Sequence, residues 1–258
     1  MSTVIYTSPI FGPVHSRRLG VSLGINLLPG DGKVCTFDCV YCECGYNQTH
    51  RAHQPLPTRQ EVAEALGQRL REMHDEGPRP DVLTFAGNGE PTVHPDFAAI
   101  VDDVIRLRDR WCPDAKLSVL SNATRIDRAE VRQALLRFDN AILKLDTVSA
   151  DYINMVDRPC GHYDMEEQLR WLEEMGERAI IQTLFMTGEH DGQNVDNTGD
   201  DFVQPWLDAL KRIGPRQVMI YTIDRETPSP LLRKASPEQL DAIAARVRSL
   251  GIPCSASY

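Results

Sequence analysis

The sequence predicts an α/β protein built as a partial (β/α)6 barrel, similar to a TIM barrel, with parallel strands inside and helices outside. Short apolar segments alternate with longer amphipathic segments along the 258 residues. The intervening segments are long enough for crossover helices, which favours parallel pairing. A content of 41% hydrophobic and 25% charged residues is typical of a globular protein with a sizeable core.

Six apolar segments have the length and composition of buried strands. They cover residues 19–27, 82–86, 116–121, 141–146, 179–186 and 217–222. Six strands make six βα units, two fewer than a complete (β/α)8 barrel. Polar residues follow several of these strands directly. Because the carboxyl ends of parallel strands meet at one end of a barrel, we expect these residues to converge on one site.

Helices between the strands are predicted from capping residues and from amphipathic periodicity. Thr58 with Glu61, Asp127 with Glu130, and Ser236 with Pro237 and Gln239 are helix-start signals. Residues 96–110, 165–175 and 201–213 have the periodicity of further helices.

The chain is predicted to form one domain over residues 1–258, because neither a composition shift nor a linker divides it. Residues 1–18 are expected to be an amino-terminal extension. Residues 187–201 contain five acids, three glycines and no Lys or Arg, which suggests a lid loop. The absence of a long apolar run and of a signal peptide predicts a cytoplasmic protein without a membrane partner.

The charge balance argues against a polyphosphate partner. The chain has 28 Lys plus Arg against 37 Asp plus Glu, a formal net charge of -9. Proteins that bind nucleic acid usually carry a basic surplus that displaces counterions, so nucleic acid is a disfavoured partner.

The strongest chemical signal is the segment Cys35-Thr-Phe-Asp-Cys39-Val-Tyr-Cys42, a C-x3-C-x2-C spacing after the first predicted strand. Seven cysteines in a chain without a secretion signal favour metal or catalytic use over disulfides. Thiolates are soft ligands that suit an iron–sulfur cluster or zinc, and three of them leave one metal position open.

Two alternatives remain open for these cysteines. Cys44, His50 and His53 follow closely and could complete a zinc site, as in a regulatory or interaction module. The three thiols could also be buried structural residues.

The cysteine motif and several other phrases resemble the radical S-adenosylmethionine (SAM) superfamily. The motif CTFDCVYC is similar to its three-cysteine signature, and Gly87 to Thr92, GNGEPT, is similar to its glycine-glycine-glutamate motif. Within this superfamily, the sequence most resembles the branch that is related to wyosine synthases. The phrases that carry this resemblance are FGPVHSRRLGVSLGIN (11–26), FAGNGEPTVHPDF (85–97), LSNAT (120–124), LKLD (143–146) and YTIDRETP (221–228).

The resemblance implies a four-iron four-sulfur (4Fe-4S) cluster on Cys35, Cys39 and Cys42, with SAM chelated to the fourth iron. An electron donor such as flavodoxin or ferredoxin would drive cleavage of SAM to methionine and a 5′-deoxyadenosyl radical that abstracts hydrogen from a substrate. The implied cofactor contacts are Tyr41 beside the adenine, Asn88, Gly89 and Glu90 at the methionine amino group, Ser121, Asn122, Lys144 and Asp146 at the ribose and carboxylate, and Gln182 and Tyr221 at the cofactor or substrate.

The substrate is expected to be a small molecule or a peptide. The acidic net charge and the lack of further clustered cysteines favour this class over transfer RNA, whose modification by a wyosine synthase-like enzyme is the alternative. Arg17, Arg18 and Arg225 are expected to hold an anionic group of the substrate, because Arg presents a fixed pair of donors to carboxylate or phosphate. The sequence assigns no catalytic side chain.

Overall fold

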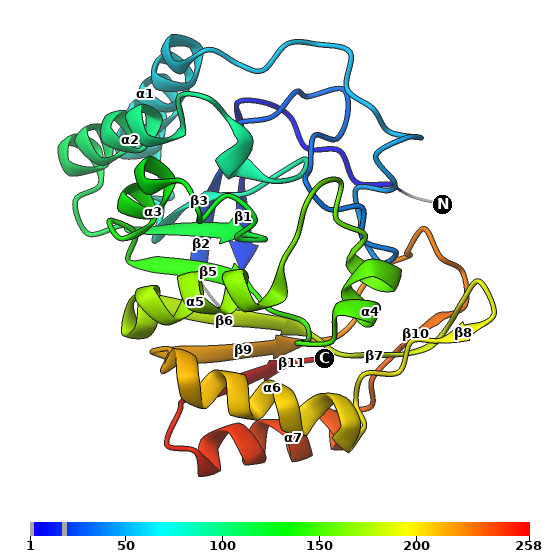
Figure 1. The fold of residues 1–258 in the computed structure, drawn as a ribbon. Helices are drawn as coiled ribbons and strands as arrows, with labels where there is room; N and C mark the ends of the chain where they lie inside the picture. Colours follow the sequence, from blue (N-terminus) through cyan, green and yellow to red (C-terminus); the bar gives the residue numbers. More distant parts are fainter. Residues whose placement is uncertain (1–2, 17–19) are drawn as a thin grey trace.

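A computed structural model describes residues 3–16 and 20–258 of the chain (Figure 1). Its main sheet has eight strands in the order β1-β2-β3-β4-β5-β6-β9-β11. The strands of this sheet are β1 (Ile10–Ser16), β2 (Gly20–Ile25), β3 (Val82–Phe85), β4 (Lys116–Ser121), β5 (Asn140–Lys144), β6 (Ala179–Leu184), β9 (Gln217–Tyr221) and β11 (Cys254–Ser257). The strands from β2 to β11 pair in parallel.

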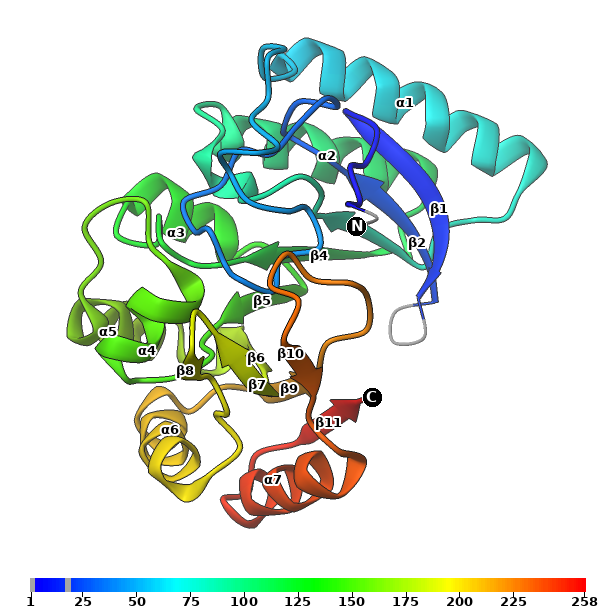
Figure 2. The same ribbon diagram turned by 90° about the vertical axis from the view of Figure 1, so that its right-hand side faces the viewer.

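Helices connect the parallel strands, and all but the three-residue helix Ala150–Tyr152 lie outside the curved sheet, as Figure 2 shows. They are α1 (Arg59–Glu76), α2 (Phe97–Trp111), α3 (Ala129–Leu135), α4 (Ala150–Tyr152), α5 (Met165–Met175), α6 (Asp200–Ile213) and α7 (Pro237–Ser249), with short turns η1 (Pro91–Val93), η2 (Ile153–Asp157) and η3 (Gly176–Arg178). Within the part of the chain that the structure describes, no helix combines the length and apolarity that crossing a bilayer requires.

All six predicted strands are present as β2, β3, β4, β5, β6 and β9, which confirms the α/β class. Thr58 and Ser236 each form the predicted capping box, at the starts of α1 and α7. The predicted cap at Asp127 is wrong, since α3 begins at Ala129 with Arg128 as its N-cap residue. Residues 124–127 instead form turns, in which Ile126 donates to the carbonyl of Ala123.

The expectation of parallel strands without hairpins is wrong at the amino terminus. Residues 10–16 of the segment expected as an extension form β1, which pairs antiparallel with β2. Gly12 and Pro13 interrupt its apolar pattern, and the register shifts between Phe11 and Val14, as is typical of an irregular edge strand. The short strand β11 was not predicted either, because its sequence contains no apolar run.

The segment at residues 187–201, expected as a possible lid loop, is a loop only in part. Its first part forms β7 (Met186–His190) and β8 (Gln193–Asn194), which make a small sheet with β10 (Leu232–Lys234), visible on the right of Figure 1. The segment is anchored by the buried side chain of Asn197, which accepts from the Met186 amide and donates to the Leu184 carbonyl, both at 2.9 Å.

The two faces of the main sheet differ in chemistry. Residues such as Leu23, Phe85 and Ile181 belong to the large core between the sheet and the helices. Residues that alternate with them face the barrel interior and include polar pairs: Ser22 lies 2.9 Å from Thr84. The same face carries the buried apolar cluster Ile142, Ile180 and Met219, so the barrel interior combines polar and apolar side chains.

Candidate functional site

The three clustered cysteines lie in the long loop between β2 and α1, at the carboxyl end of β2. On one side, Val34 pairs with Gly89 of the loop after β3. On the other side, Asp38 donates to the Asp157 carbonyl at 3.0 Å and Val40 to the Val156 carbonyl at 2.9 Å. The cysteine loop is therefore held between the segment after β3 and the segment after β5.

Gly89 permits the closest of these contacts. Its φ is +129°, and a Cβ atom there would lie 2.0 Å from the Val34 carbonyl oxygen. Only glycine fits this approach. The neighbouring Asn88 side chain donates to the carbonyls of Tyr6 and Pro29 and accepts from the Tyr6 amide, each at 2.8 Å. The Asn88 side chain thus fastens the amino-terminal segment, while its backbone borders the cysteine loop.

Glu90 is buried and joins the ends of two strands. Its carboxylate accepts from the Thr92 amide at 3.0 Å, the Thr92 hydroxyl at 2.5 Å, the Ser121 hydroxyl at 2.8 Å and the Asn122 amide at 2.6 Å. Burial raises the pKa of Glu90, and these donors oppose that shift. The Asn122 side chain lies 3.7 Å from the sulfur of Cys35, so the network reaches the cysteine loop.

The predicted residues Tyr41, Lys144 and Asp146 meet in a second buried network. Lys144 at the end of β5 forms ion pairs with Asp146 and, at 3.0 Å, with Asp157. The Tyr41 hydroxyl donates to both carboxylates, with 3.2 Å to Asp157. The Cys39 thiol donates to the same Asp157 oxygen at 3.3 Å, which links this network to the cysteine loop.

Asp157 is the site residue that the sequence did not identify. It is fully buried at the end of the π-helical turn η2, a type of turn that is frequent at functional sites. Burial raises the pKa of Asp157 to about 6, while Lys144 opposes the shift. Its Oδ2 atom is buried and has no hydrogen-bond partner among the described residues. The sequence signal was only a turn-like Asp before Arg158 and Pro159.

Gln182 lies within β6 and Tyr221 ends β9, both on the strand face that alternates with the core. In the sheet register, Gln182 is opposite Lys144 and Tyr221 is opposite Leu184. Burial raises the pKa of the Tyr221 hydroxyl. Both predicted residues are thus placed at the same end of the barrel as the Lys144 network.

The cysteines differ in their surroundings. Burial raises the pKa of Cys39 and raises that of Cys35 to about 12. A hydrogen bond from the Cys44 thiol lowers the pKa of Cys42 to about 6. Burial opposes this shift, and the charge of Lys33 favours it. Burial lowers the pKa of Lys33, but the negative charge of the neighbouring cysteine sulfurs, Cys42 foremost, outweighs burial and raises it.

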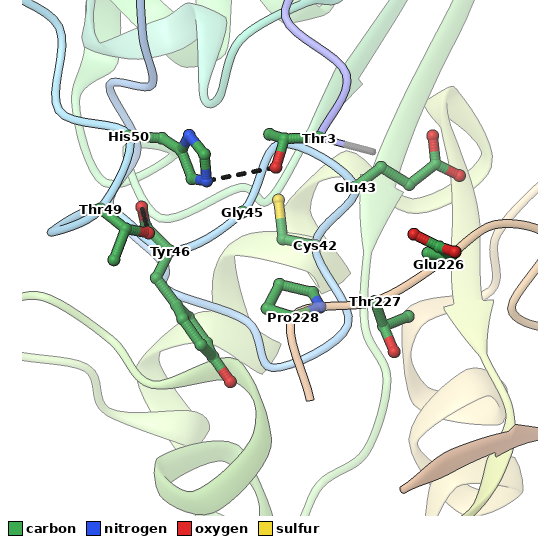
Figure 3. Close-up of a pocket in the computed structure, with 10 residues that line it drawn as sticks. All are labelled: Thr3, Cys42, Glu43, Gly45, Tyr46, Thr49, His50, Glu226, Thr227 and Pro228. Atoms are coloured by element: carbon green, nitrogen blue, oxygen red, sulfur yellow. Dashed lines mark hydrogen bonds between the residues drawn. The ribbon is translucent and has the colours of Figure 1, made fainter. Parts of the chain in front are cut away.

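A pocket of about 390 Å³ adjoins Cys42 (Figure 3). Its walls come from Thr3, the segment from Cys42 to His50, and the loop Glu226 to Pro228. The His50 ring bonds to the Thr3 hydroxyl at 3.2 Å. Within residues 3–16 and 20–258, no group of three or more His, Cys, Asp or Glu side chains is arranged to hold a single metal ion, so the zinc arrangement with Cys44 and His50 is not formed.

Of the three predicted anion-binding arginines, Arg225 lies within the described residues. Arg225 donates to Glu43 at 2.8 Å and to the Tyr6 hydroxyl at 3.4 Å, so its charge is already paired. Arg17 and Arg18 lie outside the described residues.

Comparisons with known proteins agree with this geometry. The family model of the radical SAM superfamily matches residues 31–202. A UPF0026 protein of Synechocystis sp. is 31% identical over 235 residues, which cover 87% of this chain and 78% of the relative. The first two curated relatives are spanned less completely, over 33% and 66% of their length.

Two solved structures are similar in fold. A radical SAM methyltransferase from Sphaerobacter thermophilus has a TM-score of 0.66 and 17% identity, covering 92% of this chain and 66% of that chain. Archaeal TYW1 has a TM-score of 0.53 and 14% identity, covering 88% and 71%. These likenesses confirm the partial TIM-type barrel. The three-cysteine loop at the mouth of that barrel and the family match over most of the chain lead to one conclusion: the chain belongs to the radical SAM superfamily of enzymes.

Proposed function

We propose that this protein holds a 4Fe-4S cluster on Cys35, Cys39 and Cys42 and binds SAM beside it, at the carboxyl ends of the strands. When bound, the cluster supplies one electron that cleaves SAM to methionine and a 5′-deoxyadenosyl radical, which removes a hydrogen atom from the substrate. The observation that carries the proposal is the three-cysteine loop held between the Gly89 and Asp157 segments.

The donor set of the loop fits such a cluster. Thiolates are the usual ligands of iron–sulfur clusters, and each binds a separate corner, so the three sulfurs need not converge on one point as zinc ligands do. Three protein thiolates leave one iron open for a small molecule. The buried ammonium of Lys33 is near these sulfurs and would offset part of their negative charge when they bind as thiolates.

The buried network beside Cys39 fits a cationic ligand. Lys144, Asp146 and Asp157 together carry one net negative charge when all are ionised. SAM has a sulfonium and an ammonium against one carboxylate, so its charge is complementary. The buried Asp157 carboxylate, whose Oδ2 atom has no hydrogen-bond partner among the described residues, contributes to this attraction through its charge. Lys144 orients both carboxylates.

The first experiment tests the cofactors. Protein purified without oxygen is expected to be coloured, to contain iron and sulfide, and to convert SAM to 5′-deoxyadenosine when reduced, with mass spectrometry as the readout. A variant with Cys35, Cys39 and Cys42 replaced by Ala is the matched control and should lose all three properties. A colourless wild-type protein with one tightly held zinc and no sulfide would contradict the proposal.

We infer that the substrate is a small molecule or a peptide and that flavodoxin or ferredoxin donates the electron. The net charge of -9 and the pairing of Arg225 with Glu43 support this inference over transfer RNA. Reduced enzyme is incubated with metabolite, peptide and RNA fractions from cells grown in deuterated medium, in which carbon-bound hydrogen is labelled, and deuterium in 5′-deoxyadenosine is measured. Label from the metabolite or peptide fraction supports the inference, and label from the RNA fraction alone contradicts it.

A further inference from the structure

Lys33 is a buried cation whose position the cofactor chemistry alone does not explain. Its side chain is 1% exposed, and its Nζ donates to the Gly45 carbonyl at 2.8 Å. Its backbone amide donates to the His50 carbonyl at 2.6 Å. The residue thus ties the start of the cysteine loop to its far end, and its ammonium lies inside the loop rather than in water.

The turn that holds the ammonium also contains a proposed cluster ligand. Gly45, whose carbonyl accepts from Lys33, donates its own amide to the Cys42 carbonyl at 2.9 Å. The Cys42 amide in turn donates to the Cys39 carbonyl at 3.1 Å. Lys33 is also two residues before Cys35 in the chain. The Lys33 side chain therefore lies in the same hydrogen-bonded turn as Cys42, whose side chain its ammonium also contacts.

The charge is only partly compensated by carboxylates. Asp38 lies 3.7 Å from the Lys33 Nζ, beyond a direct hydrogen bond. The Asp38 carboxylate accepts from the Asn47 amide at 2.7 Å and pairs with Arg158 at 3.5 Å, so it is shared among several partners. An ammonium removed from water requires opposite charge nearby, and in this loop the remaining anionic partners are the cysteine sulfurs.

We propose that Lys33 is a positioning residue that raises the reduction potential of the cluster, by holding a fixed positive charge beside its cysteine ligands. The inference rests on the proposed function. In the reduction step, one electron passes from an external one-electron donor of the flavodoxin or ferredoxin class to the cluster, and no bond forms or breaks. The cluster gains one negative charge, which a buried cation nearby stabilises.

Two variants separate this electrostatic role from a purely structural one. Lys33→Gln keeps a donor for the Gly45 carbonyl and removes the charge. Asp38→Asn keeps an acceptor for the Asn47 amide and removes a neighbouring negative charge. An electrostatic role predicts that the midpoint potential of the cluster falls in Lys33→Gln and rises in Asp38→Asn. A purely structural role predicts that each variant either loses the cluster or keeps the midpoint potential of the wild type.

The test is an EPR-monitored redox titration of the anaerobically prepared holoenzyme, with iron and sulfide measured on each sample. For Lys33→Gln, the equilibrium constant for one-electron reduction is expected to fall at least tenfold, which is about 59 mV in midpoint potential. Asp38→Asn should raise the midpoint. An unchanged midpoint in a cluster-loaded Lys33→Gln, or shifts of the same sign in both variants, overturns the inference.

If Lys33→Gln loses its cluster on purification, the cluster is reconstituted with iron and sulfide before titration: a lowered midpoint then supports the role of Lys33, and an unchanged midpoint, or a variant that holds no cluster even then, overturns it. A wild-type protein that binds no cluster overturns the proposed function as well. A loaded wild type with unshifted variants overturns only the role of Lys33.

Discussion

The Glu90 carboxylate accepts four hydrogen bonds from Thr92, Ser121 and Asn122, so the residue connects the segments after β3 and β4. In Glu90→Gln, an NH2 group replaces one carboxylate oxygen and cannot accept a hydrogen bond. At least one of the present donors would then be left unpaired. We expect the unfolding free energy to fall by about 1–3 kcal/mol and SAM affinity to fall with it. Urea denaturation and calorimetry measure the two effects. The exposed Glu130→Gln is the control, and equal stability of both variants would contradict this role.

Asp157 contributes differently, because one of its two oxygens is unpaired in a fully buried position. Asp157→Asn removes the charge that complements a cationic cofactor. We expect SAM to bind about tenfold more weakly, the equivalent of about 1.4 kcal/mol, while iron content is retained. Calorimetry on the unreduced holoenzyme measures binding without turnover. Unchanged SAM affinity would show that Asp157 only orients Lys144.

Between elements, the contact of the β3 loop with the cysteine loop depends on Gly89. A methyl group at this position would overlap the Val34 carbonyl, and the φ of +129° disfavours any other residue. We expect Gly89→Ala to lose most of its iron on purification, as measured by iron and sulfide analysis. Gly161→Ala is the matched control, because its added Cβ meets nothing within 4 Å. Full iron content in Gly89→Ala would mean that this contact does not position the cysteines.

The helices α1 and α2 are joined by an ion pair at the start of α1. Arg59 contacts the two oxygens of Asp103 at 2.6 and 2.8 Å, and Arg106 pairs with the same carboxylate. The hydrogen bond from Arg59 lowers the pKa of Asp103. The pair therefore stabilises the fold above the pKa of Asp103 in the unfolded chain, roughly 3.9, and this stabilisation is lost as the pH falls through the lower folded value.

We expect Asp103→Asn to reduce the unfolding free energy by about 1 kcal/mol at neutral pH, since Arg59 is partly exposed and solvent screens the pair. The difference from wild type should shrink as the pH falls below about 4. Urea denaturation at several pH values tests this. A difference that is the same at pH 7 and pH 3 would assign the effect to packing instead.

In the whole molecule, the cysteine loop and the main core are packed separately. The large core lies between the sheet and the helices, whereas Cys39 and Tyr41 belong to a smaller cluster with Tyr152 and Val156. Removal of iron should therefore leave the barrel folded and loosen the loop. We expect an unchanged far-UV circular dichroism spectrum and faster proteolysis within residues 30–55. Loss of the spectrum on iron removal would show that the barrel depends on the cluster.

The sequence by itself determined the six parallel strands, two of the helix caps and the three-cysteine motif. These features are local: apolar runs, capping residues and ligand spacing act over a few positions, so neighbouring residues contain the whole signal. The superfamily could be identified from the same motifs. The strands within segment 187–201 were not predicted because they depend on pairing with β10, about 45 residues further along the chain.

Only the tertiary structure decided which side chains meet at the site. Cys39 and Asp157 are 118 positions apart, and Glu90 reaches Asn122 across 32 positions. No local pattern marks Asp157, since an Asp before Arg158 and Pro159 is equally typical of a surface turn. The burial that leaves its carboxylate oxygen unpaired, and that places Lys33 among the cysteines, arises from the packing of separate segments. Burial and long-range contact give these residues their chemistry, and both are properties of the folded chain alone.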